Sequence, residues 1–216
     1  MKLLITTLLV ISLTSTPKVK PRILIIGDSI SIGYTPFVIE SLKNKANVVH
    51  NPGNAQHTGT GLQKIQEWVG DGQWDIVQFN WGLWDLCYRH PDSEVQGKRD
   101  KKNGKITYNI DEYASNIDSI VSRLKTITDA KLIFVTTSYV PENEAGRFKN
   151  DAILYNDAAK EIMKNHSVVV NDIYEQSISI HQKFGKGLDD VHYITEGYIE
   201  LGRQVARFLN TEIASL

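Results

Sequence analysis

The sequence contains one cysteine, Cys87, among its 216 residues. A single cysteine excludes an intramolecular disulfide and any zinc site built on a cysteine cluster. The sequence also lacks a basic excess, because 24 Lys and Arg residues stand against 25 Asp and Glu residues, for a formal charge of -1. This balance argues against a nucleic-acid partner.

Long apolar runs are absent as well. The most apolar stretch, residues 3–13, is too short for a membrane span, which needs about 20 apolar residues. It follows Lys2 and precedes small residues, a pattern typical of a signal peptide. We therefore expect residues 1–20 to be a signal peptide and residues 21–216 to form a single domain. The mature chain would then be secreted or periplasmic, without a membrane span.

Apolar strand-like runs alternate with amphipathic helix-like segments along the rest of the chain. Such alternation indicates parallel βαβ units with right-handed connections. It predicts an α/β fold, a three-layer α/β/α sandwich with about five parallel strands, and a site at the carboxyl ends of the strands. The expected strands are residues 22–27, 47–50, 75–80, 131–136 and 167–170, and the expected helices are 36–43, 61–69, 111–125, 151–165 and 196–209.

Residues 88–105 interrupt the alternation. They are rich in charged residues, include two glycines and one proline, and show no helical period. Loops of this length are usually functional or disordered.

Ser29 follows the first predicted strand directly, near the start of a helix. A serine there can face the crevice at the strand ends, close to the free N–H groups of the helix amino terminus. An Asp-Ser pair is also a common helix N-cap, so this position alone does not identify a nucleophile.

Near the other end of the chain, two carboxylates precede His192. An imidazole can take the proton of a serine hydroxyl, and a carboxylate can fix its tautomer. Asp189, three residues before His192, is the preferred carboxylate on spacing, and Asp190 is its rival.

Taken together, these segments resemble the SGNH hydrolase family, the GDSL-like lipases and acylhydrolases. Gly27-Asp28-Ser29-Ile30 looks like its first block and Asn51-Pro52-Gly53 like its second. Asp189-Asp190-Val191-His192 looks like its fifth block, and Thr195-Glu196-Gly197-Tyr198 also fits. The resemblance covers residues 22–210 and implies a flavodoxin-like sandwich, in agreement with the strand and helix pattern.

The resemblance implies a Ser29-His192-Asp189 triad and an oxyanion hole formed by the N–H groups of Ser29 and Gly53. The third block departs from the family, because Trp84 occupies the position of its oxyanion-binding asparagine. Asn80, at the end of the third predicted strand, is the expected substitute donor, and the indole N–H of Trp84 is the alternative.

The expected activity is serine esterase action on acyl esters, chiefly acetyl esters on a carbohydrate, with no metal or cofactor. The expected substrate is an ester of a small molecule, an oligosaccharide or a polysaccharide. Trp81 and Trp84 would stack on the sugar, unless they are core aromatics. The alternatives are a lipid esterase or thioesterase of the same fold, and a non-catalytic carbohydrate-binding module.

Overall fold

The computed structural model describes residues 19–71 and 73–216. Its centre is a parallel sheet of five strands in the order β2-β1-β3-β6-β7. The strands are β1 (Arg22–Ile26), β2 (Asn47–His50), β3 (Ile76–Phe79), β6 (Lys131–Val135) and β7 (Val169–Asn171). The predicted number and direction of the strands are confirmed.

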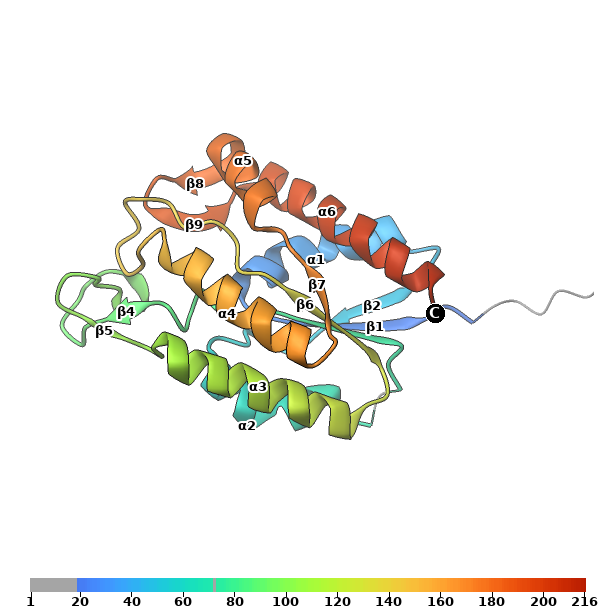
Figure 1. Cartoon of the computed structure of the whole chain (residues 1–216). Helices are drawn as coiled ribbons and strands as arrows, with labels where there is room; N and C mark the ends of the chain where they lie inside the picture. Colours follow the sequence, from blue (N-terminus) through green and yellow to red (C-terminus); the bar gives the residue numbers. More distant parts are fainter. Residues whose placement is uncertain (1–18, 72) are drawn as a thin grey trace, which may run out of the picture.

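The three central strands are buried because helices cover both faces of the sheet. Residues 23–26, 76–79 and 132–135 are buried without interruption, as expected for parallel strands that contact helices on both sides. Figure 1 shows α1, α5 and α6 on one face and α2, α3 and α4 on the other. These helices are α1 (Ser29–Leu42), α2 (Thr58–Val69), α3 (Ile110–Ile127), α4 (Asp151–Asn165), α5 (Tyr174–Phe184) and α6 (Thr195–Ala214). The α/β/α sandwich is thereby confirmed.

Two small antiparallel elements lie outside the sheet. Strands β4 (Tyr88–Arg89) and β5 (Lys105–Ile106) pair around a short 3-10 turn, η1 (Gln96–Lys98), so residues 88–106 form an ordered insertion. Strands β8 (Gly185–Gly187) and β9 (Asp190–Tyr193) form a hairpin between α5 and α6. Both elements project at the same end of the sheet in Figure 1.

The expected signal peptide lies almost entirely outside the described residues. Within the part of the chain that the structure describes, no helix combines the length and apolar character that crossing a membrane requires.

Candidate active site

Ser29 is placed by the sharp turn between β1 and α1. It is the first residue of α1, and Asp28 caps this helix by accepting a hydrogen bond from the Ile30 N–H at 2.9 Å. Gly27 precedes them, and a Cβ atom there would lie 2.6 Å from the hydroxyl oxygen of Ser31. A side chain at this position would displace Ser31, so glycine allows the close turn that leaves the Ser29 hydroxyl at the carboxyl edge of the sheet.

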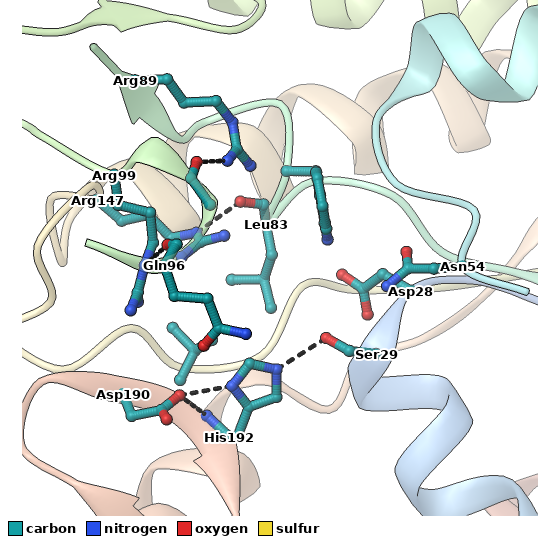
Figure 2. Close-up of a pocket in the computed structure, with 13 residues that line it drawn as sticks. Asp28, Ser29, Asn54, Leu83, Arg89, Gln96, Arg99, Arg147, Asp190 and His192 are labelled. Atoms are coloured by element: carbon teal, nitrogen blue, oxygen red, sulfur yellow. Dashed lines mark hydrogen bonds and ion pairs between the residues drawn. The ribbon is translucent and has the colours of Figure 1, made fainter. Parts of the chain in front are cut away.

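His192 reaches Ser29 from the β8–β9 hairpin (Figure 2). Its Nε2 lies 2.9 Å from Ser29 Oγ, and its Nδ1 lies 2.5 Å from Asp190 Oδ1. The same carboxylate oxygen accepts the backbone N–H of His192 at 3.0 Å. The three side chains thus form a continuous hydrogen-bonded chain of the kind that activates a serine nucleophile.

The predicted carboxylate partner, Asp189, does not contact His192, and Asp190 takes its place. The spacing of three residues suited a helical turn, but this segment is strand β9. Side chains two residues apart in a strand point to the same face, which brings Asp190 and His192 together and directs Asp189 away.

The Asp190 carboxylate is held in its ionised form by its partner. Partial burial by itself would raise the pKa of Asp190, but the hydrogen bonds from the His192 backbone and imidazole outweigh it and lower the pKa below its usual value. An ionised carboxylate at Nδ1 leaves Nε2 free to accept the serine proton.

Asp28 borders the same cavity. Only 1% of the residue is exposed, and its Oδ2 has no hydrogen-bond partner among the described residues. Burial raises the pKa of Asp28 despite the hydrogen bond from Ile30. Asp28 therefore places a buried carboxyl oxygen without a hydrogen-bond partner next to Ser29.

The loop after β2 is tied to the β1–α1 turn. Asn51 Oδ1 accepts the Gly27 N–H and the Ala55 N–H donates to the Gly27 carbonyl, both at 3.0 Å. Gly53 adopts a positive φ of 71° at the exposed tip of this loop. The next residue, Asn54, lines the cavity, while its Oδ1 accepts the N–H of Gln56.

Asn80 is not on the cavity wall. Its amide nitrogen donates to the Val135 carbonyl at 2.8 Å, across neighbouring strand ends beneath the site. The predicted oxyanion role of Asn80 is therefore not supported by the geometry, because the residue does not line the cavity and its amide group is directed to a backbone carbonyl.

The two tryptophans have different positions. Trp81 is completely buried, stacks on Trp68 and donates its indole N–H to the Ala55 carbonyl at 3.2 Å. It belongs to the core, so its predicted contact with substrate is wrong. Trp84 does line the cavity, with the Arg89 guanidinium carbon 4.6 Å from its ring centroid.

Asp85, next to Trp84, ties the loop after β3 to helix α2. It is completely buried, and its Oδ1 accepts both the backbone N–H and the hydroxyl of Thr58, at 2.9 and 2.5 Å. Burial raises the pKa of Asp85 to about 7, although the two bonds from Thr58 oppose the shift. Asp85 therefore couples the third block to the start of α2.

The cavity that these elements enclose has a volume of about 220 Å³. Besides Ser29 and His192, its wall includes polar residues that the sequence did not single out. They are Asn54, Arg89, Gln96, Arg99 and Arg147. The only sequence signal for Arg89 and Arg99 was the high proportion of charged residues in residues 88–105. Within residues 19–71 and 73–216, no three His, Cys, Asp or Glu side chains gather in a way that could hold a metal ion.

The comparisons agree with the fold and with the family resemblance. The family model described as GDSL-like Lipase/Acylhydrolase matches residues 23–205. No curated protein matches the sequence.

Several solved structures share the fold at low sequence identity. A lipase/acylhydrolase from Enterococcus faecalis has a TM-score of 0.70 at 18% identity, covering 89% of this chain and 96% of the other. The acetylxylan esterase Axe2 from Geobacillus stearothermophilus has a TM-score of 0.68 at 20% identity, covering 87% and 93%. The acetyl xylan esterase AlAXEase has a TM-score of 0.66 at 15% identity, covering 85% and 97%.

Proposed function

Because the chain belongs to the GDSL-like lipase and acylhydrolase family, we propose that it is a secreted serine esterase that removes acetyl groups from a carbohydrate. The observation that carries the catalytic part is the hydrogen-bonded chain from Ser29 through His192 to Asp190. The similarity in fold to acetylxylan esterases supports the substrate class. The apolar stretch at residues 3–13 supports export.

In the proposed mechanism, His192 Nε2 takes the proton of Ser29 as the hydroxyl oxygen attacks the ester carbonyl. Asp190 orients the imidazole and stabilises the imidazolium that forms. His192 then returns the proton to the leaving alcohol, which yields an acyl-enzyme on Ser29. The same histidine activates a water molecule, which releases the acid and regenerates the serine.

The tetrahedral oxyanion needs donors that are in place before it forms. The Ser29 N–H, at the first position of α1, has no helical acceptor and is the first donor. We retain the Gly53 N–H as the second. Asn54, whose side chain borders the cavity next to Gly53, replaces Asn80 as the proposed third donor, with the Trp84 indole N–H as the alternative.

The composition of the wall favours a polar substrate over a lipid. Three arginines, an asparagine and a glutamine border the cavity beside Leu83, Trp84 and Val191. A lipid acyl chain would leave these polar groups without partners, which costs free energy. The lipid esterase or thioesterase alternative is disfavoured on this ground.

The experiment is hydrolysis of 4-nitrophenyl acetate, followed by acetate release from acetylated xylo-oligosaccharides. We expect Ser29→Ala to lower kcat by more than about 10³-fold, because triad members act as a unit. Ser41→Ala, an exposed serine on the same helix, is the matched control and should retain wild-type kcat. More than a tenth of wild-type activity in Ser29→Ala would exclude Ser29 as the nucleophile.

A further inference from the structure

Three arginines line the cavity that holds Ser29 and His192. Arg89 and Arg99 belong to the insertion at residues 88–106, and Arg147 belongs to the segment between β6 and α4. In Figure 2 the three labelled guanidinium side chains lie together on one side of the cavity, across from Asn54.

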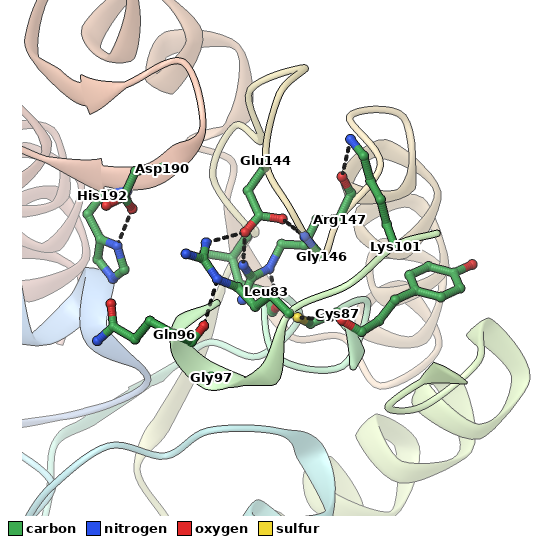
Figure 3. Close-up of polar contacts among 12 residues, drawn as sticks. Leu83, Cys87, Gln96, Gly97, Lys101, Glu144, Gly146, Arg147, Asp190 and His192 are labelled. Carbon is green, nitrogen blue, oxygen red and sulfur yellow. Dashed lines mark hydrogen bonds and ion pairs between the residues drawn. The ribbon is translucent and has the colours of Figure 1, made fainter. Parts of the chain in front are cut away.

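One buried carboxylate forms ion pairs with two of these arginines. Glu144 is completely buried, and its Oε1 contacts Nη1 of both Arg99 and Arg147, the second at 2.9 Å. Its Oε2 accepts the Gly146 N–H at 2.7 Å, and Arg147 Nε also donates to the Leu83 carbonyl at 2.6 Å. Figure 3 shows Glu144 at the centre of this network. Glu144 therefore holds the insertion against the loop that carries Arg147.

The network leaves positive charge without a counter-ion. Arg89 forms no ion pair in the described part of the chain. Its Nη1 donates to the Gly97 carbonyl, and its guanidinium group lies over the Trp84 ring. Partial burial, together with the nearby Arg147 and Arg99, lowers the pKa of Arg89, although Cys87 and Glu144 oppose the shift.

The carboxylates that border the cavity do not neutralise this group. Asp190 is engaged by His192, and Asp28 is buried on the α1 side, hydrogen-bonded to Ile30. Keeping a partly desolvated guanidinium group unpaired costs free energy, and an anionic ligand would recover that cost.

We propose that the arginine wall, led by Arg89, binds an anionic group on the substrate, so that the natural substrate is an ester of an acidic sugar or another anionic alcohol. This inference rests on the proposed esterase function and adds the substrate class. A guanidinium group pairs with carboxylate or sulfate through two parallel hydrogen bonds. An acetyl group carries no charge, so the anion belongs to the alcohol part of the ester. The aromatic ring of Trp84 holds the guanidinium in place, which reduces the entropy lost on binding.

The test compares aryl acetates that differ in charge on the alcohol side. 4-Acetoxybenzoate and 4-acetoxybenzenesulfonate carry the anion, and methyl 4-acetoxybenzoate does not. Each kcat/KM is divided by the rate of spontaneous hydrolysis of the same ester. For the wild-type protein, we expect this normalised kcat/KM to be about tenfold or more higher for one or both anionic esters than for the neutral ester. Which of the two is preferred distinguishes carboxylate from sulfate recognition. Equal or lower kcat/KM for both anionic esters would overturn the proposal.

Variants assign the preference to Arg89. Arg89→Gln should reduce the anionic-to-neutral ratio of kcat/KM by about tenfold, mainly through KM, and Arg89→Lys should restore part of it. Arg207→Gln, an exposed arginine on α6, should leave the ratio unchanged. Because both rates come from the same protein sample, partial misfolding cancels from the ratio. An unchanged ratio in Arg89→Gln would contradict the assignment.

A binding measurement separates this inference from the esterase proposal. Ser29→Ala should bind 4-acetamidobenzoate, a non-hydrolysable anionic analogue, at least about tenfold more tightly than its methyl ester by calorimetry. If Ser29→Ala abolishes turnover of the neutral ester but neither assay shows a charge preference, the esterase function stands and the anionic subsite fails.

Discussion

At the scale of single residues, the choice between two adjacent aspartates decides the geometry around His192. Asp190 lies on the same face of β9 as His192, and its Oδ1 receives both the imidazole N–H and the backbone N–H of that residue. Asp189 precedes the strand and has no contact with the ring. A difference of one position thus separates a carboxylate that fixes the tautomer from one that does not.

Asp190→Asn should lower kcat for 4-nitrophenyl acetate by about 10²–10⁴-fold, since an amide cannot stabilise the imidazolium and favours the wrong tautomer. Steady-state kinetics measures kcat for this variant and for the matched control Asp189→Asn. We expect kcat of Asp189→Asn to stay within about twofold of wild type. A large loss in Asp189→Asn with normal kcat in Asp190→Asn would reverse the assignment.

At the scale of elements, the insertion at residues 88–106 is held in place by buried charge and by backbone hydrogen bonds. The Tyr88 N–H donates to the Gly146 carbonyl and the Lys101 N–H to the Ala145 carbonyl, both at 2.7 Å. Glu144 joins the two segments through Arg99 and Arg147. Since the insertion supplies part of the cavity wall, the shape of the site depends on these backbone hydrogen bonds and on the carboxylate of Glu144.

Glu144→Gln should lower the free energy of unfolding by about 3–5 kcal/mol, because it removes the shared partner of two partly or fully buried cations. Hydrogen exchange across residues 88–106 should accelerate in the variant, and urea unfolding measures the loss of stability. Glu142→Gln, an exposed neighbour in the same loop, is the control and should change neither quantity. Normal exchange rates in Glu144→Gln would show that backbone contacts alone hold the insertion.

At the scale of the whole molecule, burial of Asp85 links the stability of the fold to pH. Burial raises the pKa of Asp85 to about 7 in the folded chain, above the ordinary value of 3.8 for an aspartate. The folded state therefore holds this proton more tightly than the unfolded state. Protonated Asp85 therefore contributes its full stabilisation of the fold below about pH 4, and this contribution is lost as the pH rises through about 7.

Asp85→Asn should become more stable relative to wild type as the pH rises from 4 to 8, by roughly 2–4 kcal/mol, because the asparagine never has to ionise in the core. Urea unfolding of both proteins at one-unit pH intervals measures this difference. Asp129→Asn, at an exposed position, should show no such trend. A constant difference between Asp85→Asn and wild type across this range would mean that Asp85 ionises normally in the folded chain.

The sequence by itself determined the layers of the fold and two members, Ser29 and His192, of the hydrogen-bonded chain in the candidate site. Apolar runs such as residues 22–26 are too uniform for a half-exposed strand, so they indicate burial between helices. Ser29 and His192 were identified because each belongs to a short block at a predicted strand end or helix start. Helix α5 was missed because its buried positions include Ser177 and His181, which read as polar in the sequence.

Only the tertiary structure decided which side chains meet in the site, because these contacts depend on side-chain direction and on pairing between distant residues. Asp190 replaced Asp189 because β9 is extended, and Asn80 does not line the cavity because its amide group is directed to the Val135 carbonyl on the neighbouring strand. Arg89 lines the cavity as part of an insertion whose Arg99 shares buried Glu144, far along the chain, with Arg147. Spacing along the chain reports local periodicity, whereas hydrogen-bond partners and counter-ions are chosen among residues that only folding brings together.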